Sequence, residues 1–182
     1  MEKMDARKRY TQMVLKQSFL KLLKDKPVNR ITVKEVCALA QLNRATFYAH
    51  FADCFDVLAQ IEDDLLRDFD HSLSSVRTVD VSALVEGIYR MIDANAEVCR
   101  VLIFQKRDAS LLPRLIERAH DQTIGPWREQ LPRASENELE MLFTCLANGL
   151  MSVVVGSFNR YDRAEVIRFI DGAVRSLFAP YR

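Results

Sequence analysis

Apolar residues recur at three- and four-residue intervals along nearly the whole chain, and this periodicity limits the possible fold more than any other feature. One face of a first helix carries Leu15, Phe19, Leu22 and Leu23. The 182 residues include only five Gly and five Pro, too few turn-forming residues for a β-sandwich. The sequence therefore predicts an all-α protein of about nine helices, long enough to bury a sizeable core.

Capping residues and helix breakers divide this pattern into separate helices. The first helix is expected to end before Pro27. Ser72–Ser82 is only weakly periodic, so it is the best position for a joint in the chain. The other expected helices span about 32–40, 43–50, 53–73, 81–95, 97–105, 109–130, 138–158 and 162–178.

The charges are distributed unevenly. Residues 1–55 contain eleven Lys and Arg against five Asp and Glu, a net charge of +6. The remaining residues contain fifteen against twenty, a net charge of −5. This split predicts that the first third of the chain meets a polyanion, although a solvated lysine-rich helix would give the same count.

Two short helices separated by a tight turn are expected within the basic third. Thr32 and Glu35 form a capping-box pattern at the start of one helix, whose inward face is expected to be Val36, Leu39 and Ala40. A turn at Gln41–Leu42 leads to Asn43, a good N-cap for the next helix. With the longer helix in front, this pattern predicts a helix-turn-helix motif.

Residues 43–51 divide into two faces when they are placed on a helix. Phe47 and Phe51 are expected to point inward, towards Leu39 and Leu42. Ala45 and Ala49 lie on the outward line, where small side chains permit close approach to the floor of the DNA major groove.

The polar residues of the same helix carry groups that contact DNA in other DNA-binding proteins. Arg44 presents a forked donor to guanine edges or phosphate, and Thr46, Tyr48 and His50 carry phosphate donors. Alternatively, Tyr48 and His50 only cap a hydrophobic corner. Together with the outward alanines and the basic charge, the pattern favours DNA binding.

These residues also resemble a known family. Ile31-Thr-Val-Lys-Glu-Val-Cys-Ala-Leu-Ala40 and Asn43-Arg-Ala-Thr-Phe-Tyr-Ala-His-Phe51 are similar to the DNA-binding head of TetR-type (TetR/AcrR) transcriptional regulators. The match covers about Leu15–Leu58. From Ala147 onward, the chain resembles the last two helices of the subgroup that includes dihydroxyacetone-kinase operon activators.

The resemblance implies a homodimeric repressor that binds a near-palindromic operator, with its DNA affinity modulated by a small effector. It implies a helix-turn-helix DNA-binding domain at 1–53 and a helical dimerisation and effector body at 54–182. Bases would face Arg44, Ala45 and Thr46, and phosphates would face Tyr48, His50 and Thr32. The expected DNA-binding residues are Thr32, Lys34, Asn43, Arg44, Ala45, Thr46, Tyr48 and His50.

The chain departs from the family pattern at two positions. Gln41 stands where Gly is usual, so either a positive φ is more costly here or the turn is built differently. Cys54 replaces a common Lys, which would leave the amides at the start of the fourth helix to contact phosphate. Either departure would weaken operator binding or shift it towards Lys34, Arg30 and an arm at residues 7–9.

The acidic remainder contains a long helix without formal charge. Met141–Phe158 is as long as a membrane-spanning helix, but its polar and small residues favour a buried helix in a soluble, cytoplasmic protein. A helix that is apolar on nearly every side must be shielded from water by other helices. We expect a second copy of the chain to supply part of this shielding, through a homodimer formed by about 138–158 and 162–178. The side chains expected to line an effector pocket are Tyr89, Phe104, Trp127 and Phe143.

Other classes of protein receive less support. The sequence contains no signal-peptide pattern, no phosphate-binding Gly-rich loop and no metal-spaced Cys cluster, so we expect no enzyme activity, metal or cofactor. Two alternatives remain: a helical adaptor that binds protein, and a redox-responsive regulator that acts through Cys37 or Cys54.

Overall fold

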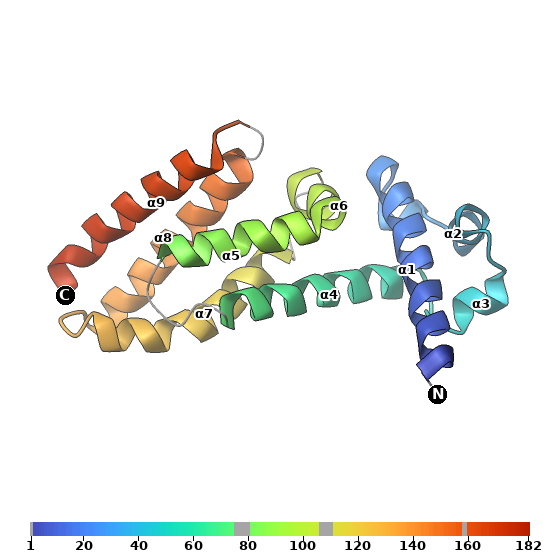
Figure 1. Ribbon diagram of the computed structural model, residues 1–182, viewed down its shortest axis with the longest axis horizontal. Helices are drawn as coiled ribbons and strands as arrows, with labels where there is room; N and C mark the ends of the chain where they lie inside the picture. The colour runs from blue at the N-terminus through green and yellow to red at the C-terminus, as the bar shows by residue number, and fades with distance from the viewer. Residues whose placement is uncertain (1, 75–80, 106–110, 158–159) are drawn as a thin grey trace. The chain divides into compact units, whose positions relative to one another are not determined.

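A computed structural model of the protein describes residues 2–74, 81–105, 111–157 and 160–182 (Figure 1). Within these residues it contains nine α-helices and no β-strand, which confirms the predicted all-α class. The helices are α1 (Glu2–Asp25), α2 (Val33–Ala40), α3 (Arg44–Tyr48), α4 (Cys54–Ser74), α5 (Val81–Ala94), α6 (Ala96–Cys99), α7 (Leu111–Gln130), α8 (Glu136–Ser157) and α9 (Arg163–Phe178). Shorter turns are the 3₁₀ segments η1 (Val28–Arg30) and η3 (Ala179–Tyr181) and the π-helical segment η2 (Arg100–Gln105).

Capping residues start α8 and α9 within about two residues of the expected positions, 138 and 162. The Asp162 side chain accepts hydrogen bonds from the first amides of α9. Ser135 and Glu138 form a reciprocal capping box before α8. The predicted helix at 97–105 is instead divided between α6 and η2. Three parts of these predictions lie outside the described residues: residues 75–80 of the joint at Ser72–Ser82, residues 109–110 of the helix at 109–130, and Phe158 of the helix at 138–158.

The chain forms two compact units. The first contains Met1–Leu65 and Glu97–Lys106. Its core includes Leu15 and Phe19 of α1 and Val36 of α2, all without measurable exposure. Segment η2 packs against α1, and the Nζ atom of Lys24 lies 2.7 Å from Oε1 of Glu97. This unit therefore includes a segment from the middle of the sequence.

The second unit contains Leu66–Ala96 and Arg107–Arg182. Within it α8 packs against both α7 and α9, and α9 also packs against α5. The rings of Trp127 and Phe178 meet edge to face, with their centroids 4.8 Å apart. At the start of α9, the guanidinium of Arg163 forms two hydrogen bonds, of 2.8 and 2.9 Å, to the carboxylate of Asp93. These contacts fix the helices that surround the apolar centre of the unit.

One described segment meets the length and composition of a membrane-spanning helix. Glu136–Gly156 has a mean hydropathy of 1.6. The core helix of a soluble protein meets the same criteria, so this finding is weak evidence for a membrane. In α8 the buried side chains include Leu139, Phe143 and Val154, whereas Met141 is 62% exposed. One side of the helix is thus covered within the chain and another is not.

Candidate nucleic-acid interface

A reciprocal cap holds the start of α2. The Thr32 amide donates to Oε2 of Glu35 at 2.9 Å, and the Glu35 amide donates to Oγ1 of Thr32 at 3.3 Å. Lys26 donates to the other Glu35 oxygen at 2.5 Å. The hydrogen bond from Lys26, followed by those from Thr32, lowers the pKa of Glu35 to about 2. The carboxylate therefore stays charged near the proposed DNA surface, where Lys26 compensates for it.

The turn between α2 and α3 uses a left-handed residue. Gln41 has φ 55° and ψ 39°, and it is the one non-glycine residue with positive φ in the described chain. The Leu42 amide donates to the Cys37 carbonyl, and the Gln41 amide donates to the Ala38 carbonyl. This pair of bonds is a Schellman motif, in which Gly is the usual left-handed residue. The costly positive φ expected at this position is therefore present.

Helix α3 is short, and its first turn is held by Asn43. Oδ1 of Asn43 accepts a hydrogen bond of 2.7 Å from the Thr46 amide and one of 2.9 Å from the Thr46 hydroxyl. The helix ends at Tyr48, and the amides of His50 and Phe51 both donate to the Phe47 carbonyl. The observed helix is about two residues shorter than the predicted one, but the cap at Asn43 is confirmed.

The inward face of α3 consists of aromatic rings. Phe47 is fully buried and Phe51 is 2% exposed, and their ring centroids lie 5.8 Å apart. The prediction that both point inward is confirmed. Leu39, by contrast, is 46% exposed, so its predicted place on the inward face of α2 is wrong. Cys37 is buried there instead.

The outward face of α3 carries the residues predicted to meet DNA. Arg44, Ala45 and Ala49 are exposed, and Tyr48 is 57% exposed. Lys34, on α2, is exposed as well. Neither Lys34 nor Arg44 has an ion-pair partner within the described chain, so both cations are available to an anionic partner.

Two hydroxyls on this surface already donate their protons within the chain. The Thr32 hydroxyl donates to Glu35 at 2.7 Å, and the Thr46 hydroxyl donates to Asn43. To donate to a phosphate or a base, each would first have to give up an internal hydrogen bond. These two hydrogen bonds do not use the Asn43 amide nitrogen or the Tyr48 hydroxyl, so either group can donate to DNA without breaking them.

His50 is half-buried, and its buried Nδ1 atom has no hydrogen-bond partner in the part of the chain that the structure describes. The tautomer with its proton on Nε2 avoids burying an unpaired N–H donor at Nδ1. This tautomer leaves Nε2–H to donate, as a phosphate contact requires.

The start of α4 is less suited to phosphate than the sequence suggested. Oδ1 of Asp53 accepts a hydrogen bond of 2.8 Å from the Asp56 amide, and Oδ2 of Asp56 accepts one of 2.8 Å from the Ala52 amide. Two carboxylates therefore occupy this helix end and repel an anion. Cys54 is buried, whereas the neighbouring Phe55 side chain is 55% exposed.

Burial disfavours the reactive thiolate form of the two cysteines next to the motif, Cys37 and Cys54. Burial raises the pKa of Cys37, and the charge of Arg44 offsets this effect only in part. Burial also raises the pKa of Cys54, with an added contribution from the charge of Asp53. Because the thiolate is the reactive species, these shifts argue against a redox switch at either residue.

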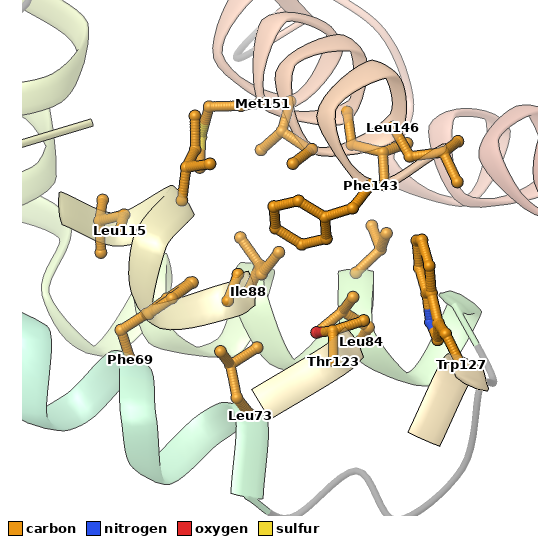
Figure 2. Close-up of a pocket in the computed structure, with 16 residues that line it drawn as sticks. Phe69, Leu73, Leu84, Ile88, Leu115, Thr123, Trp127, Phe143, Leu146 and Met151 are labelled. Carbon is orange, nitrogen blue, oxygen red and sulfur yellow. The ribbon is translucent and has the colours of Figure 1, made fainter. Parts of the chain in front are cut away.

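The four residues predicted to line an effector pocket lie in different surroundings. Trp127 and Phe143 line a cavity in the second unit (Figure 2). The ring of Tyr89 instead packs against the guanidinium of Arg163, 4.4 Å from the ring centroid. Phe104 belongs to the first unit. Most of the cavity residues that sequence reasoning missed are aliphatic side chains, which look like ordinary core in a sequence; the exceptions are Phe69, Thr123 and Met151.

No protein-family model and no curated protein matches the chain. Solved structures do match it. A TetR transcriptional regulator from Streptococcus agalactiae 2603V aligns with a TM-score of 0.68 at 20% identity, over 93% of this chain and 96% of that one. The fatty acid degradation regulator FadR from Bacillus halodurans aligns with a TM-score of 0.65 at 13% identity, over 94% and 96%.

The dihydroxyacetone kinase operon activator DhaS also aligns, with a TM-score of 0.60 at 19% identity over 94% of this chain and 96% of that one. The chain thus has the fold of TetR-type transcriptional regulators. The resemblance predicted from the helix-turn-helix residues is confirmed at the level of the fold.

Proposed function

We propose that the protein is a sequence-specific DNA-binding transcriptional regulator that acts as a homodimeric repressor on a near-palindromic operator. The observation that carries the proposal is the division of α3 into two faces. Phe47 anchors the helix in the core, while Arg44 and Tyr48 project from the opposite side beside Ala45 and Ala49. A fold that presents a short helix in this way supports docking in a major groove. On this proposal residues 1–53 bind DNA and residues 54–182 form the body.

Electrostatics supports the same function. The net charge of +6 over residues 1–55 is not fully neutralised by the ion pairs of Lys16, Lys24 and Lys26. Lys34 and Arg44 remain for phosphates or guanine edges, and each phosphate neutralised releases counterions. Binding should therefore weaken steeply as salt rises.

The polar residues divide by the role that their geometry supports. Arg44, Ala45 and Thr46 face bases in the proposal, and Thr46 accepts rather than donates as long as its proton bonds Asn43. Tyr48, His50 and Lys34 contact phosphates. Thr32 positions α2 and reaches a phosphate only when its hydroxyl leaves Glu35.

Dimerisation through α8 and α9 explains the apolar side chains that these helices expose. Phe169 is 65%, Met141 62% and Leu177 40% exposed. Gly149 and Gly156 are exposed too, and a Cβ atom added at either would meet nothing within 4 Å. A second copy packed on this surface would cover the apolar side chains and use the room that the glycines leave. The two heads would then meet half-sites about 34–36 Å apart, or a multiple of that distance.

Other functions find less support in the site. In the described ranges, no group of three or more His, Cys, Asp or Glu residues is placed to hold a metal ion. The likeness to solved transcriptional regulators supports the proposal of a cytoplasmic regulator and not an enzyme. A protein-binding adaptor would leave the unpaired cations beside α3 without a role.

Fluorescence anisotropy with duplex DNA from upstream of the gene tests the proposal. Affinity should fall linearly with salt on logarithmic axes, with a slope of about −0.9 per neutralised phosphate. Arg44→Ala should lower the affinity about 10- to 100-fold, as expected for loss of a bidentate base contact. Tyr48→Phe should weaken binding by removing the hydroxyl alone.

Two lysine variants separate a specific contact from general charge. Lys34→Gln should reduce the magnitude of the salt slope by about 0.9. Lys21→Gln removes the same charge from an exposed position on α1 and should change the slope less. The proposal fails if the protein shows no salt-sensitive binding and if neither Arg44→Ala nor Tyr48→Phe changes it.

A further inference from the structure

The first turn of α3 contains a pair of hydrogen bonds whose direction is fixed by chemistry. Oδ1 of Asn43 accepts one from the Thr46 amide at 2.7 Å and one from the Thr46 hydroxyl at 2.9 Å. A backbone amide can only donate, so the Asn43 atom that it meets must be the carbonyl oxygen. That oxygen can only accept, so the Thr46 hydroxyl must donate its proton to it.

This arrangement determines what each side chain can offer to an external partner. Because its proton is used within the chain, the Thr46 hydroxyl oxygen has only lone pairs left and acts as an acceptor. The Asn43 amide nitrogen has no hydrogen-bond partner within the described residues and can only donate. The exposed Arg44 guanidinium is also a donor alone. The start of α3 therefore presents two donor side chains and one acceptor.

An acceptor on this surface fits few of the groups that DNA presents. Phosphate oxygens, guanine O6 and N7, and thymine O4 are all acceptors. The hydrogen-bond donors of the major groove are the exocyclic amino groups, N6 of adenine and N4 of cytosine. The N-terminal residues of a helix docked in this groove are the ones that contact base edges. Thr46 is thus suited to an amino group and not to a phosphate.

We propose that Thr46 recognises an amino-bearing base, adenine or cytosine, at one position of each operator half-site. Asn43 is the positioning residue that imposes this choice. The inference rests on the proposed function, in which α3 enters the major groove. Thymine or guanine at the same position of the strand presents a keto oxygen, which Thr46 can bind only if its hydroxyl leaves Asn43. The loss of one such hydrogen bond corresponds to about a 2- to 10-fold loss of affinity.

Selection from a library of randomised duplexes, with the full-length protein, locates the position. The parent should enrich adenine or cytosine over thymine or guanine at one position of each half-site. Thr46→Val replaces the hydroxyl with a methyl group and should lose the preference at that position alone. Thr46→Ser keeps the hydroxyl and should keep the preference. Both variants retain the bond from the residue 46 amide to Asn43, and thermal melts check that they are folded.

A matched pair of substitutions tests the positioning role of Asn43. Gly is an acceptable N-cap, so Asn43→Gly should preserve α3 while it releases the Thr46 hydroxyl to donate or accept. The preference for amino-bearing bases should then fall below about twofold, although Thr46 is unchanged. Asn43→Asp keeps both accepted hydrogen bonds and should keep the preference. It should weaken binding to all sequences, because the added carboxylate repels the phosphates.

A base analogue tests the contact directly. Purine in place of adenine, or 2-pyrimidinone in place of cytosine, removes only the amino group at the selected position. The parent should bind the altered duplex about 2- to 10-fold more weakly, whereas Thr46→Val should bind both duplexes within about twofold.

The results separate this inference from the proposed function. The inference is overturned if the protein binds DNA and the position that responds to Thr46→Val selects thymine or guanine. It is also overturned if no position responds, if Asn43→Gly keeps the full preference, or if removal of the amino group weakens the parent and Thr46→Val equally. In each of these cases sequence-specific DNA binding stands, whereas a protein without salt-sensitive DNA binding contradicts the proposed function itself.

Discussion

Thr32 and Glu35 bind each other through three hydrogen bonds, of 2.7, 2.9 and 3.3 Å. The backbone amides of Thr32 and Glu35 are both satisfied in this way. The Glu35 carboxylate also accepts a hydrogen bond from Lys26, so one half-buried residue connects the segment just after α1 with the start of α2. The charged Glu35 carboxylate thus contributes to the junction that leads into the helix-turn-helix.

The stability of the first unit should consequently depend on pH. The hydrogen bond from Lys26, followed by those from Thr32, lowers the pKa of Glu35 from its ordinary value of 4.5 to about 2. A lowered carboxylate pKa stabilises the fold fully above pH 4.5, and this stabilisation is lost as pH falls towards 2. Glu35→Gln should therefore be less stable than the parent at pH 7, and the gap should narrow below pH 4.5.

Denaturant-unfolding midpoints of both proteins between pH 7 and pH 3 measure this effect. Glu129→Gln, at an exposed position of α7, is the control and should not change the pH dependence in this way. A gap between Glu35→Gln and the parent that stays constant over the whole pH range would contradict the assigned role of the Glu35 charge.

Gln41→Gly should stabilise the protein. A left-handed conformation costs a residue with a Cβ atom about 1–2 kcal/mol, while Gly costs about 0.5–1 kcal/mol in added chain entropy. The net gain should be about 0.5–1 kcal/mol in the free energy of unfolding, measured by denaturant titration. Gln17→Gly makes the same change at an exposed position in α1 and should destabilise by about 1 kcal/mol. If both substitutions destabilise alike, the left-handed turn is not where the structure puts it.

Phe169→Glu should dissociate the proposed dimer. An apolar ring that is 65% exposed in the single chain would be covered in the dimer, and a carboxylate there would be buried without a partner. Sedimentation equilibrium should show at least about a tenfold rise in the dimer dissociation constant. Tyr10→Glu changes an aromatic residue of similar exposure, 64%, on α1 and should leave the dimer intact. A parent protein that is monomeric at all concentrations would refute the interface.

Three cysteines should resist alkylation in the native protein. Burial raises the pKa of Cys37 and Cys54, and it raises the pKa of Cys99 to about 12, so little thiolate forms at pH 8. Iodoacetamide labelling followed by peptide mass spectrometry should give rates for these three at least about tenfold below those of the denatured chain. Mild oxidant should leave DNA binding unchanged, and Cys54→Ser should behave like the parent. Rapid native labelling of Cys54, with loss of DNA binding, would restore the redox alternative.

Local features of the fold were predictable from the sequence because they depend on neighbouring residues. The capping box at Thr32, the cap at Asn43 and the cap at Asp162 each involve residues within three positions of one another. The inward rings of Phe47 and Phe51 follow from the same short-range geometry. These features are sufficient to indicate the helix-turn-helix.

Features that depend on the packing of distant segments were not predictable in the same way. On α2, Cys37 lies on one side of Val36 and Ala40, and Leu39 lies on the other, so the apolar face can be drawn to include either residue. The neighbouring helices bury Cys37 and leave Leu39 exposed. Likewise, Trp127 and Phe143 line a cavity while Tyr89 does not, a difference that follows from which helices surround each ring. Periodicity identifies apolar residues but not their partners.

Residues 97–106 belong to the same compact unit as α1, α2 and α3, and Val101, Leu102 and Ile103 are buried. The chain leaves that unit after Leu65, returns at Glu97 and leaves again after Lys106. A gene fusion that transplants the N-terminal helices as one piece would therefore omit part of the core that supports them. On the proposed function, a working chimera would have to take two separate stretches of sequence, so recombination at a single crossover point would not give this protein a new operator specificity.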